Sequence, residues 1–341
     1  MAWSCALTAA LAVVASGACA APWQDALAPA GPQAAHIARL WNLMLAVCTL
    51  VYVAVGIGVL LSLRNRLGRA DATTPPDVAL LTTREQGPAR VVTAAVAVSI
   101  VLLLALFVAS VVTQRALASM PLTEALNIEV TGNQFWWEVR YQDPQPSRIF
   151  TTANEMHIPV GRPVQIQLRS TDVIHSLWIP NLHGKKDLIP GQTALLQLRA
   201  DAPGVYRAQC AEFCGYQHAH MALHVVAESA EQYAQWADAQ RQPAAEPAQA
   251  DERRGRDVFL AGTCVMCHTV QGTPAQGRYG PDLTHLASRP TLAAGTLPNT
   301  RGHLAAWIVD PQSIKPGTNM PANVLPPEDL QALLAYLTSL R

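Results

Sequence analysis

The longest apolar stretches of the chain lie in its N-terminal third. Two runs, residues 40–63 and 91–114, each contain 24 residues without a charge and are bounded by arginines. A helix rises about 1.5 Å per residue and the hydrocarbon core of a bilayer is about 30 Å thick, so either run is long enough to span a membrane. The pattern predicts a transmembrane hairpin over residues 36–116.

The segments beside these runs predict the orientation of the hairpin. The loop between them holds Arg64, Arg66, Arg69, Arg84 and Arg90. Since arginine-rich loops remain on the cytoplasmic side, we expect both termini and everything after Arg115 to lie outside. Residues 1–20 are uncharged, rich in alanine and end in small residues, which is typical of a cleaved signal peptide. Lipidation of Cys19 is the alternative.

A period of two dominates the next segment, residues 120–235. Apolar and polar residues alternate over 137–141, 164–169 and 196–199, as in strands with one buried face. Glycine and proline separate these runs, for example at Pro190-Gly191. Many short strands with regular turns predict a β-sandwich or a barrel.

The period changes again after a polar segment with two prolines, residues 236–251, which we interpret as a linker. Beyond it, apolar residues are spaced as on one face of a helix, at Leu330, Leu333, Leu334 and Leu337. Residues 252–341 are therefore predicted to form a small helical domain. The predicted fold is that of a multidomain membrane protein, with a two-helix hairpin, a β-sandwich domain and an all-α domain.

Composition narrows the classes of function. The 341 residues include 24 Lys and Arg against 24 Asp and Glu, so the formal net charge is zero. No basic surplus is available to bind nucleic acid. Only 14% of the residues are charged and 50% are hydrophobic, which indicates a membrane protein rather than a purely soluble one.

The cysteines supply the first candidate chemistry. Cys264 and Cys267 precede His268 in a C-x-x-C-H sequence, the attachment signature of c-type haem, in which the histidine reaches the iron. Methionine is a common sixth ligand in electron carriers. Met320, in a proline-flanked loop, is a better candidate than Met266, which lies between the two thiols. A disulfide or a thioredoxin-like pair is the alternative, but a βαβ pattern is absent from the predicted domain.

A second cluster places thiols, a carboxylate, imidazoles and a thioether within twelve residues. Its members are Cys210, Glu212, Cys214, His218, His220 and Met221. A zinc site would leave the methionine unused, whereas thiolate, imidazole and a weak thioether are typical of copper electron-transfer sites. Two bridging thiolates could hold two coppers, which requires a further histidine. His175 is the best candidate, and the competitors that remain open are His183, His220 and His224.

The order of these motifs resembles a known family. Gly132-Asn133-Gln134-Phe135-Trp136-Trp137 follows the hairpin, and Asp172-Val173-Ile174-His175-Ser176 precedes a C-x-E-x-C-G-x-x-H-x-x-M sequence. The chain is similar to subunit II of haem–copper cytochrome c oxidase, in the caa3 variant with a cytochrome c domain fused at the C-terminus. This resemblance implies a cupredoxin-like domain with a dinuclear copper centre, CuA, and a class I cytochrome c domain.

The resemblance implies roles for the residues of the copper motif. Cys210 and Cys214 would bridge the coppers, and His175 and His218 would bind one copper each. Met221 and the backbone carbonyl of Glu212 would be weak axial ligands. The side chain of Glu212 would also face a magnesium ion shared with subunit I.

The resemblance extends to the C-terminal domain. Gly255 and Phe259 match the N-terminal helix of class I cytochromes c, and Tyr336 falls on the C-terminal helix that crosses it. Pro281 lies in the loop that supports the axial histidine, His268. Met320 would be the sixth ligand of the haem iron.

Two positions depart from the family pattern. The aromatic run where electrons from soluble cytochrome c are expected to enter is Phe135, Trp136 and Trp137, with Phe135 where the family usually has tryptophan. This difference fits a tethered electron donor. Near the start of the second hairpin helix the only acidic residue is Glu85, to which we assign no proton-channel role.

The resemblance implies an enzyme subunit that does not itself contain the oxygen site. Electrons would pass from an external cytochrome c or reductase to haem c, to CuA and to haem a of subunit I, where oxygen is reduced with proton pumping. Subunits I and III would be partners in a bacterial cell membrane, with both cofactor domains on the periplasmic side. The alternatives are the electron-entry subunit of a nitric oxide reductase and a membrane-anchored copper chaperone, which would explain neither Met221 nor the haem motif.

Overall fold

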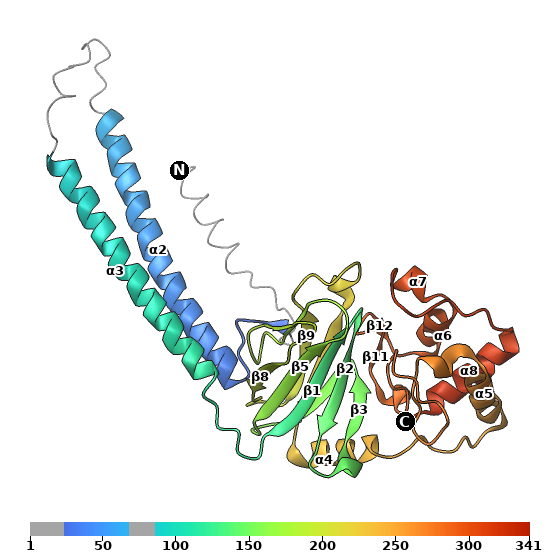
Figure 1. Cartoon of the computed structure of the whole chain (residues 1–341). Coiled ribbons are helices and arrows are strands. Elements are labelled where there is room, and N and C mark those ends of the chain that lie inside the picture. Colours follow the sequence, from blue (N-terminus) through green and yellow to red (C-terminus); the bar gives the residue numbers. More distant parts are fainter. Residues whose placement is uncertain (1–23, 68–85) are drawn as a thin grey trace, which may run out of the picture. The chain divides into compact units, whose positions relative to one another are not determined.

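The computed structural model describes residues 24–67 and 86–341 (Figure 1). The predicted signal peptide and Glu85 lie outside the described residues. The chain forms two compact units, which divide between Ala35 and His36 and between Ser119 and Met120.

The first unit, residues 36–119, contains α3 (Gln86–Leu117) and all but the first turn of α2 (Pro32–Leu67). Both are long and apolar enough to cross a membrane. Their apolar side chains are exposed to a degree that a protein core does not show, as at Leu60 and Val101, which are 67% and 65% exposed. Contact with lipid would cover such a surface. The two predicted membrane helices are therefore present.

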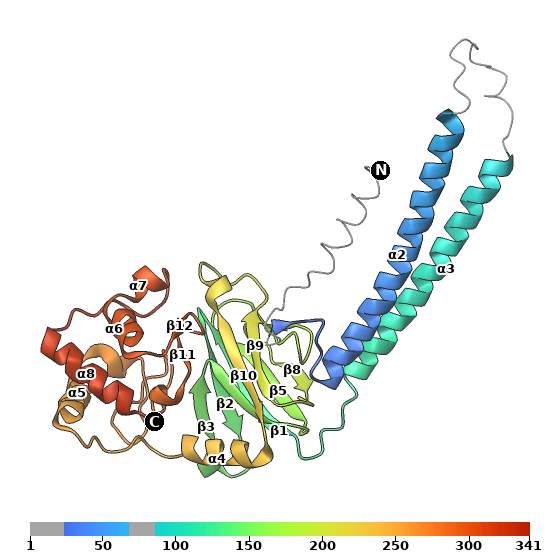
Figure 2. The ribbon, with the colours of Figure 1, turned by 180° about the vertical axis from the view of Figure 1, so that it is seen from behind.

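The second unit begins with a two-layer β-sandwich, which both views show (Figures 1 and 2). One sheet has the order β3-β2-β1-β5-β8, made of β1 (Leu126–Asn133), β2 (Trp136–Gln142), β3 (Phe150–Ala153), β5 (Val164–Ser170) and β8 (Ala194–Leu198). The other has the order β4-β10-β9-β6-β7, made of β4 (Glu155–Pro159), β6 (His175–Trp178), β7 (Lys186–Leu188), β9 (Gly204–Cys210) and β10 (Ala222–Glu228). The predicted β-sandwich is confirmed, and it is the cupredoxin-like domain that the resemblance implies.

The alternating pattern of the sequence decides which side chains fill the space between the sheets. In β5, Val164, Ile166 and Leu168 are fully buried, while Gln165 and Gln167 between them are only partly buried. Successive side chains of a strand point to opposite faces, so one face of each sheet is apolar and packs against the other sheet. Trp137 on β2 is also fully buried in this core.

Helix α4 (Ala230–Gln240) follows the sandwich and contacts β3 and β4, and Figure 2 shows it below β3. Ser229 begins it with a capping box, in which its side chain accepts from the backbone N–H of Gln232 and the Gln232 side chain accepts from the backbone N–H of Ser229. Trp236 stacks on His157 of β4 with ring centroids 4.0 Å apart. The helix thus includes residues 236–240, which the sequence pattern assigned to the linker.

The C-terminal part has a hydrophobic core of its own, built mainly by helices. Its elements are α5 (Ala250–Ala261), β11 (Thr291–Leu292), β12 (Leu297–Pro298), α6 (Arg301–Val309), α7 (Pro311–Ile314) and α8 (Pro327–Ser339). Leu333, Leu334 and Leu337 are buried, as their spacing predicts. The predicted helical domain is confirmed.

The crossing of α5 and α8 depends on Gly255. A Cβ at this position would lie 1.9 Å from the backbone oxygen of Ala332 on α8. One turn further along α5, Phe259 packs against Tyr336, with ring centroids 5.9 Å apart. The glycine therefore allows the two helix backbones to approach each other directly.

We expect Gly255→Ala to open this crossing, because overpacking a tight contact costs about 1–3 kcal/mol. Hydrogen–deuterium exchange of the full chain should show faster exchange in both α5 and α8. Gly302→Ala is the matched control, since Gly302 is also helical and nothing lies within 4 Å of a Cβ there. Unchanged exchange in α5 and α8 of Gly255→Ala would contradict the packing described.

Candidate metal centre and haem pocket

The cysteine-rich motif forms a closed loop between β9 and β10. Cys210 ends β9, and Met221 directly precedes β10. The backbone N–H of Cys210 donates to the carbonyl of Met221 at 3.0 Å, which joins the two ends of the loop. His175, the first residue of β6, comes from the strand beside β9. The antiparallel pairing of β6 with β9 brings this histidine to the loop although it lies 35 residues earlier in the chain.

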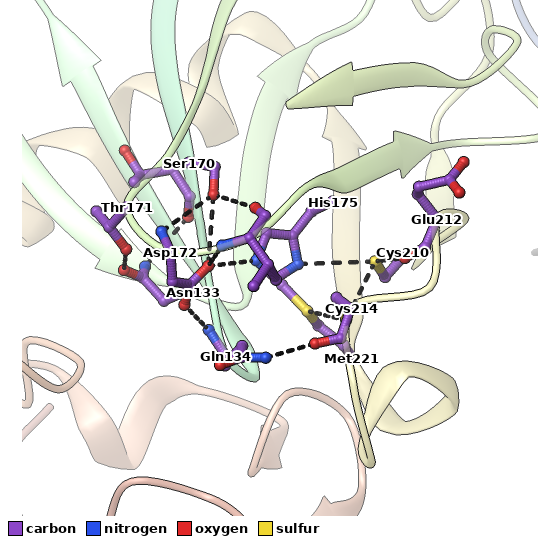
Figure 3. A network of polar contacts seen from close by, with 12 residues as sticks. Asn133, Gln134, Ser170, Thr171, Asp172, His175, Cys210, Glu212, Cys214 and Met221 are labelled. Atoms are coloured by element: carbon purple, nitrogen blue, oxygen red, sulfur yellow. Dashed lines mark hydrogen bonds and ion pairs between the residues drawn. The ribbon is translucent and has the colours of Figure 1, made fainter. Parts of the chain in front are cut away.

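Four donor atoms lie at the centre of the cluster, and Figure 3 shows those of His175, Cys210 and Cys214. The sulfurs of Cys210 and Cys214 are 3.8 Å apart. Nδ1 of His175 lies 3.9 Å from the Cys210 sulfur, and Nδ1 of His218 lies 3.8 Å from the Cys214 sulfur. Each thiol therefore has an imidazole of its own. Both cysteines are free thiols in this structure.

Two weaker donors complete the set. The sulfur of Met221 lies 4.0 Å from the Cys214 sulfur, and the carbonyl oxygen of Glu212 lies 3.3 Å from the Cys210 sulfur. Soft thiolate and thioether ligands with imidazole suit copper. A single tetrahedral zinc would use four donors, whereas the structure brings six together.

The contact between the two sulfurs lowers the pKa of Cys210 to about 3 and raises the pKa of Cys214. The hydrogen bond with His175 also lowers the pKa of Cys210. One thiolate is therefore available at neutral pH, and a bound cation would favour loss of the second proton. Thiolates are the form that binds metal.

Asp172 holds His175 in place and was not singled out by the sequence. Its carboxylate Oδ1 lies 2.8 Å from Nε2 of His175, so the opposite ring nitrogen, Nδ1, faces the Cys210 sulfur. Burial lowers the pKa of His175, but the hydrogen bonds with Asp172 and Cys210 outweigh it, so the net shift is upward. A carboxylate behind a metal-binding histidine fixes the ring orientation and the tautomer. The position of a carboxylate three residues before His175 is the sequence signal that could have identified Asp172.

The other histidines of the sequence analysis lie elsewhere. His183 Nδ1 contacts the carbonyl of Gly184 at 3.1 Å, and His220 Nδ1 contacts the side chain of Gln217 at 2.9 Å. His224 faces Thr291 at 3.5 Å. Among the described residues, the metal-type cluster combines His175 with Cys210 and Cys214. Geometry thus favours His175 over its three competitors.

The carboxylate of Glu212 points away from the thiols (Figure 3). It forms an exposed ion pair with Lys185, with Nζ and Oε2 3.0 Å apart. Glu212 therefore presents two different groups, its carbonyl toward the sulfurs and its carboxylate toward the surface.

The C-x-x-C-H motif opens onto a cavity of about 510 Å³. Cys264, Cys267, His268 and Met320 all line it, and the rest of its wall is largely apolar, with side chains such as Phe259 and Leu304. Both thiols are free in this structure. The structure therefore brings the predicted attachment residues and both predicted axial ligands to one cavity.

His268 is prepared to act as a ligand. Its Nδ1 lies 2.7 Å from the carbonyl oxygen of Pro281, which leaves Nε2 as the second ring nitrogen. Burial lowers the pKa of His268, which favours the neutral imidazole that binds metal. A Cβ on Gly280 would lie 2.6 Å from the His268 ring, so the loop packs directly against the imidazole.

Arg289 adds a buried cation to the cavity wall. Its side chain is nearly inaccessible, and Nε has no hydrogen-bond partner. The carboxylate of Glu155 lies 4.0 Å from this Nε. A buried donor without a partner is costly. A haem, which carries two propionates, would supply the acceptor, so this feature fits that group.

The aromatic run connects the two sites. Phe135 and Trp136 line the haem-sized cavity. Trp137 packs in the sandwich core, where its Nε1 donates to the carbonyl of Met221 at 3.4 Å. Phe135 and Trp137 are 4% and 0% exposed, so neither offers a surface to an external protein.

Comparison with known proteins gives two family matches. The model described as "Cytochrome C oxidase subunit II, periplasmic domain" matches residues 143–229, and the model described as "Cytochrome c" matches residues 252–341. The two matches coincide with the parts of the chain that carry the thiol cluster and the cavity.

Two curated relatives are cytochrome c oxidase subunit 2 proteins. That of Alkalihalophilus pseudofirmus is 41% identical over 215 residues, which cover 63% of this chain and 61% of the relative. That of Bacillus sp. strain PS3 is 33% identical over 267 residues, which cover 72% of each protein. The periplasmic domain of subunit II of cytochrome oxidase from Bradyrhizobium japonicum, a crystal structure, is 28% identical and covers 36% of this chain and 97% of that one, with a TM-score of 0.33.

We expect Asp172→Ala to weaken copper binding by about 10–100-fold, because His175 loses the partner that orients it. A competition titration with a copper chelator measures the change. Asp201→Ala is the control, since Asp201 pairs with Arg199 on the surface. Equal affinity of the wild type and Asp172→Ala would show that Asp172 does not position the ligand.

Proposed function

The chain belongs to the cytochrome c oxidase subunit 2 family, and on that premise we propose that it is the electron-entry subunit of a haem–copper oxidase. Its C-terminal domain would receive electrons in a covalently bound haem c. Its β-sandwich domain would pass them on through a dinuclear CuA centre to haem a of subunit I. Oxygen would be reduced to water in that partner, with proton pumping.

The observation that carries the proposal is the paired arrangement around the two thiols. Cys210 has His175 and the Glu212 carbonyl beside it, and Cys214 has His218 and Met221. Two sets of this kind, joined by the sulfurs, match two copper ions that share both thiolates. A copper chaperone has no need of the second set or of the cavity.

In the haem domain, Cys264 and Cys267 would hold the porphyrin by thioether bonds. His268 and Met320 would bind the iron from its two faces, a pairing typical of electron carriers with raised potentials. The guanidinium of Arg289, in the wall of the cavity, would donate to a haem propionate. When bound, the haem and the copper supply one-electron redox chemistry, while the protein fixes their surroundings.

The fold limits how much the ligands move when an electron arrives. Asp172 holds His175, and Pro281 holds His268, each through the ring nitrogen opposite the ligand nitrogen. The β9–β10 pairing holds Cys210 against Met221. Ligands fixed in both oxidation states keep the energy of reorganisation small, which fast electron transfer requires.

The arginine-rich loop between the membrane helices supports an orientation in which both cofactor domains would lie on the periplasmic side of a bacterial cell membrane. Subunits I and III are the proposed partners, with an external cytochrome c or reductase as the donor. The exposed carboxylate of Glu212 would contribute to a magnesium site at the contact with subunit I. Lys185, which pairs with Glu212, would have to give way to that ion.

The full chain, matured with haem and loaded with copper, tests the cofactor assignment by optical and electron paramagnetic resonance spectroscopy. We expect c-type haem bands together with a copper signal in which one unpaired electron is shared by two copper nuclei. Cys214→Ser should remove the shared signal and leave the haem bands. A mononuclear copper spectrum in the fully loaded wild type would contradict the CuA assignment.

A second prediction concerns the sixth ligand of the haem. Met320→Ala should convert the haem from low spin to high spin and lower its reduction potential, because the thioether ligand that raises it is lost. Met266→Ala is the control, since Met266 also lines the cavity but lies between the attachment thiols and is 74% exposed. A low-spin haem of unchanged potential in Met320→Ala would rule out this ligand.

A further inference from the structure

Lys315 is buried where the haem domain meets the copper domain. It is 2% exposed, whereas the only other lysines of the sequence, Lys185 and Lys186, are exposed. Lysine is almost never fully buried unless it is paired. Its burial therefore calls for a specific reason.

The ammonium group of Lys315 joins the two domains. It donates to the carbonyl of Phe135, in the aromatic run of the copper domain, at 2.8 Å. It also donates to the carbonyl of Ala293, in the haem domain, at 2.9 Å. Without Lys315, the buried carbonyl of Phe135 and the partly buried carbonyl of Ala293 would each lose a donor, which is unfavourable.

The loop that begins at Lys315 ends at the proposed haem ligand Met320, and it touches the copper domain twice more. The carbonyl of Pro316 accepts from the side chain of Gln217, which precedes the proposed copper ligand His218. The side chain of Asn319 donates to the carbonyl of Gln134 at 3.3 Å. The loop thus lies between the two proposed ligand sets.

Gln134 continues this connection into the copper loop. Its Nε2 donates to the carbonyl of Cys214 at 2.5 Å, a contact that Figure 3 shows. A short path of bonds and hydrogen bonds therefore runs from Met320 through Asn319 and Gln134 to Cys214. Phe135, whose carbonyl accepts a hydrogen bond from Lys315, directly follows Gln134 in the chain.

We propose that Lys315 is a positioning residue for electron transfer inside this chain: it holds the Met320 loop against Gln134 and Phe135 and so fixes the haem site relative to the copper site. This inference rests on the proposed function. When both groups are bound, the reduced haem would give up one electron and the oxidised copper centre would take it up, so no bond would form or break and Lys315 would transfer no proton.

The test compares Lys315→Met with the wild type in the assembled oxidase. Methionine is unbranched and flexible, so it fills the space without donating a hydrogen bond. The first readout is hydrogen–deuterium exchange over residues 133–136 and 293–296, which we expect to become about tenfold or more faster. The second readout is the rate of haem-to-copper electron transfer after a photoexcited ruthenium complex reduces the haem, which we expect to fall.

Lys186→Met is the matched control, since it removes an exposed lysine of the copper domain. Reduction of the haem by the external donor should stay at the wild-type rate in every variant, because Lys315 acts only on the internal step. A loss of folding would change both steps and the haem spectrum. Should Lys315→Met fail to assemble, Asn319→Leu removes another hydrogen bond of the same loop and should shift both readouts in the same direction.

Wild-type rates of both exchange and internal transfer in Lys315→Met would overturn the proposal, as would an equal loss in Lys186→Met. Failure of the proposed function gives a different result. A wild-type oxidase without the shared copper signal would refute the CuA assignment, while the exchange measurement would still decide whether Lys315 holds the two domains together.

Discussion

The copper domain has to hold the sulfurs of Cys210 and Cys214 3.8 Å apart without a disulfide between them, and the rest of the site depends on this constraint. Two thiolates at that distance repel each other, so they need cations and fixed donors around them. The second sheet supplies these, because β10, β9 and β6 are neighbours and bring Met221, Cys210 and His175 together at one end. Two residues just after strands β5 and β1 of the other sheet hold this group in place. Asp172 contacts the His175 ring, and the side chain of Gln134 donates to the carbonyl of Cys214.

Local motifs could be predicted from the sequence, whereas contacts made by folding could not. Cys210, Cys214, His218 and Met221 lie within one loop, so their spacing alone indicated a metal site. His175 was one of four open histidines until the resemblance selected it, because only the pairing of β6 with β9 brings it to the thiols. The C-x-x-C-H motif could also be recognised from the sequence, because its residues lie close together along the chain.

Two residues that matter here were given no role of their own from the sequence. The importance of Asp172 comes from the ring nitrogen that it contacts, which the sequence does not show. The burial of Lys315 comes from the contact between domains. By contrast, the alternation of β5 predicted the β-sandwich and the spacing of leucines in α8 predicted the helical domain. Each pattern arises because one face of the strand or helix is buried.

The two hydrophobic cores are separate, yet the haem cavity draws its wall from both domains. Phe135 and Trp136 belong to the copper domain and line the cavity of the haem domain. The aromatic run that would face a soluble donor in the family is therefore covered by the C-terminal domain of this chain. An external donor would then act on the haem domain rather than on the copper domain.

Native mass spectrometry of the full chain decides whether one chain carries both cofactors. We expect a mass increase of one haem and two copper ions, with the haem retained after denaturation because Cys264 and Cys267 would bind it covalently. A chain that holds one copper or a zinc ion at saturation, or that loses its haem on denaturation, would refute the cofactor assignment.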